Sequence, residues 1–474
     1  MKFRKASLAL RATIAIFSFL VIQTAAQAQD KPNVVIMMVD NLGWGEIGTY
    51  GGGLLRGAET PVLDALAEEG TKLLNFNVEN QCTPSRSALM TGRHPIRSGT
   101  TRVVWGVLYG MVSWEVTMAE LFSDAGYATG MFGKWHLGDV PGRFPTDQGF
   151  DEWYGVANTT DESWYREQLQ YDPEVGVQPF VQEAVKGETP TTVAPYTVEK
   201  RRLIDSEVNE RAIDFIERQA NADKPFFAFI PYTQPHLPTL PHPDFEQITG
   251  NGHYADVLAE IDHRAGEILD TLDELGLRDD TIVIWTSDNG PEEARGWHGT
   301  AGFWRGQYFT ALEGSMRTSF LVRWPGMIPA GRVSNEIVHI TDLLPTLASI
   351  AGYEVPSDRI IDGIDQLDFF TGKQETSNRE GFPIYVGDDI FAYKWRNWKV
   401  HFWQLDNMFS AAQKLNVPNV HNLLSDPKEL YPDRTGETTW VLPPILKRVV
   451  AHQATLLQEP PIRLGTPDPY TPPE

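Results

Sequence analysis

The sequence predicts an α/β protein in which a large layered sheet lies between helices and a smaller antiparallel sheet with one helix follows. Strand-like and helix-like segments alternate over about 350 residues, which is typical of layered α/β folds. After residue 372 the pattern changes to closely spaced short strands and one final helix. We therefore expect a large domain over residues 29–372 and a small α+β subdomain over residues 373–474.

The predicted strands of the large domain are mostly continuous apolar runs, as expected for strands buried on both faces. They cover residues 33–39, 73–78, 127–132, 226–232, 281–286 and 319–324. Helical spacing predicts helices over residues 61–69, 118–125, 198–219, 254–275 and 341–351. Residues 145–195 have no clear period, and we expect long surface loops over a site there. The subdomain is expected to hold strands over 383–386, 391–394 and 398–403 and a helix over 441–457.

The first 28 residues have the pattern of a secretory signal peptide. Four basic residues and an apolar run over residues 12–22 precede Ala26-Gln27-Ala28, a small-x-small cleavage site. The run is short for a membrane-spanning helix, and an uncleaved anchor is the alternative. We expect cleavage after residue 28 and export to the periplasm or the medium, with no membrane association afterwards.

The formal net charge of the 474 residues is −23, and removal of the four basic residues of the leader lowers it to −27. Such a charge disfavours nucleic acid and anionic membranes as partners. An anionic substrate would need a local cationic site or a metal ion. Cys82 is the single cysteine, so an intrachain disulfide is excluded.

Four polar residues each follow a strand that is predicted to be buried: Asp40, His136, His236 and Asp288. In open α/β sheets, ligands bind at the carboxyl ends of strands. The sequence therefore predicts that these four residues share one site.

Asp40-Asn41 and Asp288-Asn289 each combine a carboxylate with an amide at a strand end. Four hard oxygen ligands suit Ca²⁺ or Mg²⁺ and do not suit zinc. Either pair alone is also common in Asx turns and helix caps. Together they predict a metal site.

Cys82 precedes a short apolar segment that is expected to be helical, where backbone N–H groups favour an anion. The alternative is a buried cysteine that acts as a small hydrophobe. Arg86 lies one turn further on the same face and can hold an oxyanion or the nucleophile, or it is a surface arginine. Lys134 and His136 face one side of an extended segment, as site residues or as a surface lysine beside a packed histidine. His236, held between prolines, suits an acid/base role or a structural turn.

Five segments together resemble the type I sulfatase family of the alkaline phosphatase superfamily. They are QCTPSRSALMTGRHP, NVVIMMVDNLGWGEIGTYGG, GYATGMFGKWHLG, TSDNG and ALEGSMRTSFLVRWPG. The resemblance runs from about Asn33 to the segment of Asp362 and Asp365, and weakly to HNLLSDP. It implies an alkaline-phosphatase-like fold with a catalytic domain over residues 29–372 and hydrolysis of sulfate esters.

The resemblance also implies that a maturation enzyme oxidises Cys82 to formylglycine. Its hydrate is a geminal diol, of which one oxygen attacks sulfur. The second hydroxyl lets the sulfated intermediate collapse to the aldehyde and release sulfate. The family further implies Ca²⁺, or Mg²⁺, on Asp40, Asn41, Asp288 and Asn289.

By the same resemblance, Arg86 orients the nucleophile and Lys134 binds sulfate oxygens. His136 is the base for collapse, and His236 binds sulfate and protonates the leaving alcohol or phenol. Two positions depart from the family pattern: Asn41 stands where a second aspartate is usual, and Tyr308 stands where a lysine is usual, five residues before Glu313. The expected replacements for that lysine are Tyr308, Arg305 and His298, unless they belong to a structured surface loop.

The aromatic residues Trp105, Trp164 and Trp304 are candidate pocket walls for an aryl or sugar sulfate, although tryptophan is as often part of a core. Two alternatives stay open. One is a phosphodiester or phosphonate monoester hydrolase that uses the same site. The other is a non-catalytic binding protein with an unmodified Cys82.

Overall fold

The computed structural model describes residues 31–104, 110–222, 224–294, 297–433 and 435–467. The predicted signal peptide lies outside these residues. Among the described residues, no helix combines the length and the apolar character needed to cross a bilayer.

A ten-stranded mixed sheet forms the centre of the large domain, in the order β14-β2-β13-β9-β1-β8-β4-β5-β6-β7. Its strands are β1 (Asn33–Asp40), β2 (Thr71–Leu73), β4 (Ala128–Lys134), β5 (Glu152–Val156), β6 (Phe180–Val185), β7 (Thr191–Pro195), β8 (Phe226–Pro235), β9 (Thr281–Ser287), β13 (Phe320–Arg323) and β14 (Arg332–Ser334). The central strands β9, β1, β8, β4 and β5 run parallel to one another. β13, β6 and β7 pair antiparallel at the two sides.

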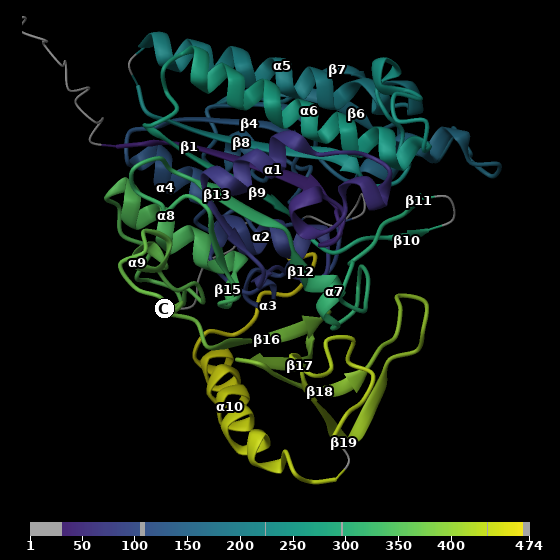
Figure 1. Cartoon of the computed structure of the whole chain (residues 1–474). Coiled ribbons are helices and arrows are strands. Elements are labelled where there is room, and N and C mark those ends of the chain that lie inside the picture. The colour runs from purple at the N-terminus through teal and green to yellow at the C-terminus, as the bar shows by residue number, and fades with distance from the viewer. Residues whose placement is uncertain (1–30, 105–109, 223, 295–296, 434, 468–474) are drawn as a thin grey trace, which may run out of the picture.

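Strand β1 is buried along its whole length because both faces of the sheet are covered by helices (Figure 1). Val34, Ile36 and Met38 pack into one core with α2 (Cys82–Thr91), α4 (Met118–Asp124), α8 (Leu343–Ala351) and α9 (Leu367–Phe370). The alternate residues Val35 and Met37 pack on the opposite face with α1 (Pro61–Glu69), α5 (Val198–Ala222) and α6 (His253–Glu274). This alternation follows from the two-residue period of a strand.

Shorter elements fill the edge of the sheet near α2. β3 (Phe76–Asn77) pairs with β12 (Arg317–Thr318) and β15 (Val338–His339), and β10 (Glu293–Ala294) pairs with β11 (Trp297–His298). Two short helices, α3 (Pro95–Ser98) and α7 (Glu313–Met316), complete this region.

The C-terminal subdomain is a four-stranded antiparallel sheet with one long helix (Figure 1). It consists of β16 (Gly381–Val386), β17 (Asp389–Trp395), β18 (Trp398–Gln404), β19 (Gln413–Asn422) and α10 (Leu442–Gln458). One group of its apolar residues, with Phe382 and Ile384, packs against Met316 and Ile337 of the large domain. Another group, with Val400, packs against Ile445 of α10. The subdomain sheet is therefore held between α10 and the large domain.

The predicted fold class is confirmed, and three local predictions were wrong. The single strand expected over 73–78 is two strands, β2 and β3, in different sheets. Residues 145–195 are not only loops, because they contribute β5, β6 and β7. The subdomain has a fourth strand, β19, whose first residues are polar and exposed and so lack the apolar pattern of a buried strand.

Candidate functional site

The carboxyl ends of four parallel strands bring the predicted site residues together. In the order β9-β1-β8-β4, Asp288 follows β9, Asp40 ends β1, His236 follows β8 and Lys134 ends β4. The site therefore exists because adjacent parallel strands end at the same edge of the sheet.

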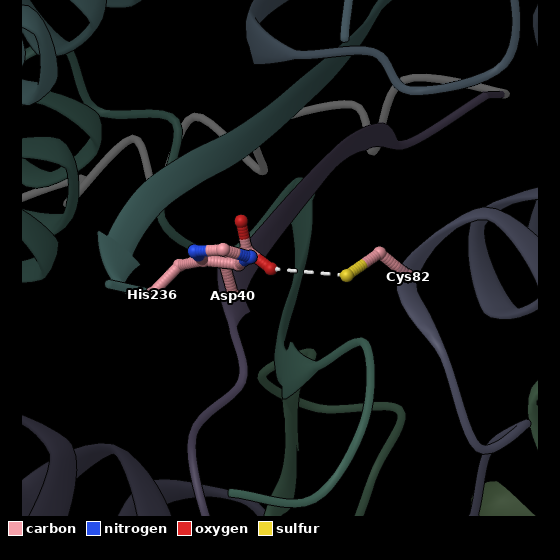
Figure 2. Close-up of side chains that lie close together, drawn as sticks. All are labelled: Asp40, Cys82 and His236. Carbon is pink, nitrogen blue, oxygen red and sulfur yellow. Dashed lines mark hydrogen bonds between the residues drawn. The ribbon is translucent and has the colours of Figure 1, made fainter. Parts of the chain in front are cut away.

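Cys82 is the first residue of α2 and is 1% exposed. Its Sγ lies 3.6 Å from both Asp40 Oδ1 and Asn41 Oδ1, and its single S–H can donate to either oxygen. Figure 2 shows the thiol directed from α2 at the carboxylate of Asp40, which lies beside His236. Burial raises the pKa of the Cys82 thiol well above its usual value, so the unmodified side chain is a neutral thiol at physiological pH.

Two fully buried basic side chains, Arg86 and Lys134, lie near Cys82. Arg86 donates to Asp288 Oδ2 through Nε at 3.0 Å and Nη2 at 2.8 Å, and through Nη1 to the carbonyl of Lys134. Lys134 Nζ lies 2.6 Å from Asp40 Oδ2. Burial alone would raise the pKa of Asp40, but the charges of Lys134, His236 and Arg86 hold it far below its usual value. Asp40 is therefore ionised.

The four oxygen-bearing residues form a connected group that fits a hard divalent cation. Asn41 has a positive φ of 64°, and its N–H donates to Asp288 Oδ1 at 3.0 Å. Asn289 Nδ2 donates to Asn41 Oδ1 at 2.5 Å. Asn289 Oδ1 is buried and has no hydrogen-bond partner in the described part of the chain. An unpartnered oxygen beside two buried carboxylates is the environment in which Ca²⁺ or Mg²⁺ binds.

His136 is buried and has a defined tautomer. Its Nε2 lies 3.0 Å from the carbonyl of Val104, and a carbonyl accepts only, so Nε2 carries the proton. Burial, followed by the charges of Lys134 and Arg86, lowers the pKa of His136 well below its usual value. Nδ1 therefore keeps a lone pair, and no described residue hydrogen-bonds to it. The arrangement presents a buried, neutral base.

His236 is oriented by its own backbone. Nδ1 lies 2.7 Å from the carbonyl of Leu237 and therefore donates to it. Nε2 faces Thr159 Oγ1 at 3.5 Å and Glu292 Oε1 at 3.9 Å. One ring nitrogen is thus fixed by the chain while the other is directed at polar groups of the cavity described next.

A cavity of about 420 Å³ opens above Cys82. It is lined by Cys82, Val103, His136, Thr159, Asp161, His236, Leu237, Glu292, Glu293, Tyr308, Met408 and Phe409. Sequence reasoning missed several of these residues. Glu292 lies only four positions after Asp288 and could have been found from that spacing. Met408 and Phe409 belong to the loop between β18 and β19, and no local pattern marked this loop as part of the site.

A further residue that the sequence did not reveal is Thr160. Its Oγ1 donates to Asp40 Oδ2 at 3.1 Å, the same oxygen that Lys134 contacts. Thr159 and Thr160 lie at the start of the 3₁₀ helix η4 (Thr160–Glu167), inside the region expected to cover the site.

Only one of the three residues proposed to replace the usual lysine lines this cavity, namely Tyr308. Burial raises the pKa of Tyr308 well above its usual value, so it is a neutral hydroxyl. Arg305 instead donates to the carbonyls of Lys428 at 2.7 Å and Glu429 at 3.0 Å in the subdomain. His298 is exposed, at the end of β11.

Two of the three candidate tryptophan walls do not line the cavity. Trp304 stacks under the guanidinium of Arg317, 3.8 Å from the ring centroid, and neither Trp304 nor Trp164 is among the described residues lining the cavity. Trp105 lies outside the described residues. The aromatic wall is formed by Phe409 and Tyr308 instead.

Comparisons with known proteins cover both domains. The sulfatase family model matches residues 32–353, and the model of the N-sulphoglucosamine sulphohydrolase C-terminal region matches residues 300–430. The chain is 34% identical over 477 residues to N-acetylgalactosamine-6-sulfatase of Canis lupus familiaris, covering 91% of this chain and 88% of that protein. It is 34% identical over 430 residues to arylsulfatase A of Homo sapiens, covering 84% and 83%. The crystal structure of the PsFucS1 sulfatase from Pseudoalteromonas sp. superposes with a TM-score of 0.86 at 31% identity, covering 92% of each chain.

Proposed function

Since this chain belongs to the type I sulfatase family, within the alkaline phosphatase superfamily, and is a sulfatase, we propose that it hydrolyses the sulfate ester of a saccharide through a formylglycine made from Cys82. The observation that carries the proposal is the convergence of Cys82, Arg86, Lys134, His136 and His236 on one buried point beside two carboxylates. The roles assigned to these residues from the sequence remain predictions.

The proposed metal ligands are Asp40, Asn41, Asp288 and Asn289, with Ca²⁺ preferred and Mg²⁺ as the second choice. When bound, such an ion neutralises negative charge on the sulfate oxygens and on the nucleophile. Asn41 in place of a second aspartate removes one negative charge from the site, which favours weaker metal binding. The unpartnered Asn289 Oδ1 supports this assignment.

The basic side chains near position 82 have separate proposed roles, one in positioning the nucleophile and one in binding sulfate. Arg86, fixed on Asp288, holds the oxygen nucleophile in place. Lys134 uses one of its three N–H donors on Asp40 and can offer the others to sulfate oxygens. Such preorganised donors are usually the largest contribution to catalysis.

The two histidines are suited to opposite proton transfers. His236, with Nδ1–H held by Leu237, delivers a proton from Nε2 to the leaving oxygen as the S–O bond breaks. His136 accepts a proton at its free Nδ1 from the second hydroxyl of the hydrate, which expels sulfate and regenerates the aldehyde. Water then adds to the aldehyde and restores the hydrate, while His136 releases its proton to solvent and His236 takes one up.

The cavity walls support a saccharide with a single sulfate group. Asp161, Glu292 and Glu293 contribute carboxylates, which accept hydrogen bonds from sugar hydroxyls and repel a second anionic group. Among the described lining residues the only basic side chains are the two histidines. Phe409, which is 84% exposed, offers a flat apolar surface for a pyranose ring. The relatives named for N-acetylgalactosamine-6-sulfate hydrolysis agree with a sugar substrate.

Export is part of the proposal, with a leader over residues 1–28 and a periplasmic or extracellular destination. A separate formylglycine-generating enzyme is the partner required for maturation.

The proposal is tested by producing the chain with a maturation enzyme and comparing release of sulfate and phosphate from matched esters. We expect sulfate release from a monosulfated sugar to dominate, and chelation followed by Ca²⁺ addition to abolish and restore it. Mass spectrometry of the peptide that contains residue 82 should detect the aldehyde. Cys82→Ala should fold and be inactive.

Three outcomes would contradict the proposal. A larger efficiency on the phosphate or phosphonate ester would favour the alternative hydrolase. An intact thiol in active protein from its native host would exclude the formylglycine. An undiminished rate after verified metal removal would exclude the metal.

A further inference from the structure

A second cluster of potential metal ligands is buried where the large domain meets the C-terminal subdomain. Glu79 follows β3, His94 lies between α2 and α3, and His339 ends β15. Their residues are 3%, 1% and 0% exposed. One ligand atom from each lies within 4.8 Å of the others. None of the three lines the catalytic cavity.

Both imidazoles face the same carboxylate oxygen. His94 Nδ1 is 3.0 Å and His339 Nε2 is 3.8 Å from Glu79 Oε1. In a tetrahedral site with metal–ligand bonds of about 2.0–2.1 Å, neighbouring ligand atoms are roughly 3.3–3.4 Å apart. The observed separations lie on either side of this value, so small side-chain movements would admit an ion.

One ring nitrogen of His339, Nε2, faces Glu79. Nε2 is buried without a hydrogen-bond partner among the residues that the structure describes. Nδ1 lies 3.0 Å from Thr341 Oγ1 and 3.3 Å from the Thr341 N–H. If Nδ1 accepts from that N–H, then Nε2–H is buried with no acceptor closer than Glu79. If Nδ1–H donates to the hydroxyl, Nε2 has a free lone pair, which is the state of a metal-bound histidine.

The two arginines near the cluster pair with other carboxylates, so the Glu79 carboxylate remains free to bind a metal ion. Arg97 pairs with Asp362 at 2.7 Å, and Arg379 pairs with Asp342 through both carboxylate oxygens. Neither arginine neutralises Glu79. A buried carboxylate whose nearest charged or titratable neighbours are two imidazoles gains from a bound cation.

We propose that Glu79, His94 and His339 form a structural site for a borderline divalent metal, best matched by zinc. Two imidazoles and one carboxylate are zinc ligands, whereas calcium prefers oxygen ligands alone. A water molecule completes the coordination. Because Glu79 precedes α2 and His94 follows it, the ion ties both ends of the helix that carries Cys82 to β15. The site is independent of the proposed catalytic metal.

The test is metal binding by the full chain in a Cys82→Ala background, which removes the thiol as a competing zinc ligand. Each protein is incubated with Zn²⁺ alone, desalted, and analysed by plasma mass spectrometry. We expect one zinc per chain, and zinc affinity reduced about tenfold or more in His94→Gln and His339→Gln. His263→Gln, which changes an exposed histidine on α6, should bind zinc normally. Calcium binding should be unchanged in all of them.

Cobalt supplies a second readout that does not depend on stability. Co²⁺ bound in the cluster should give visible absorption typical of tetrahedral nitrogen and oxygen ligands, and this absorption should disappear in His94→Gln and Glu79→Gln. Circular dichroism establishes that each variant is folded. The proposal is overturned if the folded parent binds no zinc, or if the folded ligand variants bind zinc and cobalt as the parent does.

Discussion

Lys394 of β17 donates to the carboxylate of Glu313 at 2.6 Å across 81 residues of sequence, and both side chains are fully buried. Arg317 and Lys399 also contact this carboxylate, at 2.6 and 3.1 Å. Lys394 further donates to Asn75 and Asn77 at 2.8 and 2.9 Å. The subdomain therefore supplies positive charge to Glu313, the first residue of α7 in the large domain.

Lys394→Met should destabilise the protein by about 1.5–3 kcal/mol, because it removes a buried hydrogen bond to the charged Glu313 and leaves Asn77 Oδ1 without its Lys394 donor. Calorimetric melting checks this result, with Lys373→Met on the surface as the control. The double variant Glu313→Gln/Lys394→Met should cost less than the sum of the single changes. Strict additivity would show that the two residues are not coupled.

Arg86→Lys should reduce kcat on the order of 100-fold, because a lysine cannot contact Asp288 and the Lys134 carbonyl together. The effect should fall on kcat more than on KM, since the proposed role of Arg86 is to position the nucleophile. Steady-state kinetics with measured calcium and formylglycine contents separates this effect from loss of metal or of maturation. A rate close to that of the parent would exclude the positioning role.

Tyr308→Phe should lower kcat/KM about tenfold, which corresponds to the loss of one hydrogen bond worth about 1.4 kcal/mol. Because burial keeps the hydroxyl protonated, this loss should be constant from neutral to moderately alkaline pH. Tyr431→Phe, at an exposed position, is the matched control. An unchanged kcat/KM would remove Tyr308 from the list of groups that replace the usual lysine.

Phe409→Ala should raise KM for a sulfated sugar several-fold and leave small aryl sulfates almost unaffected, because only the larger substrate reaches this ring. Leu424→Ala changes another exposed apolar residue of the subdomain and should alter neither value. Parallel kinetics on the two substrates checks the difference. Equal effects on both would indicate that Phe409 shapes the cavity and does not select the sugar.

Glu162 gives the protein a pH-dependent stability. Burial, followed by the charges of Asp161 and Asp139, raises the pKa of Glu162 from 4.5 to about 8. The folded chain thus retains a proton that the unfolded chain releases, so this contribution is complete below pH 4.5 and is lost as the pH rises toward 8.

Glu162→Gln should therefore become more stable relative to the parent as the pH rises, by on the order of 4 kcal/mol at pH 8. Melting temperatures at a series of pH values give the difference, with Glu174→Gln on the surface as the control. A difference that does not change between pH 4.5 and 8 would contradict the raised pKa.

The central sheet and the strand-end residues were predictable because both depend on local pattern. A buried parallel strand is a continuous apolar run, and Asp40 or Asp288 follows such a run directly. The part of the cavity wall that Phe409 forms was not predictable, because it does not depend on a local sequence pattern. Phe409 reaches the cavity from a loop more than 300 residues after Cys82, and only the packing of the two domains brings them together. Arg305 is close to Tyr308 in sequence but does not line the cavity, because it donates to carbonyls of the subdomain.

The burial of α2 along its whole length has a consequence for biosynthesis. An enzyme that oxidises Cys82, as proposed, cannot reach Sγ once this helix has packed. Oxidation must therefore act on the nascent or unfolded chain, and a molecule that folds first is trapped as an inert thiol form. The yield of active molecules then depends on the rate of Cys82 oxidation relative to the rate of folding. A substitution that speeds folding can therefore lower total activity even when it raises the stability of the protein.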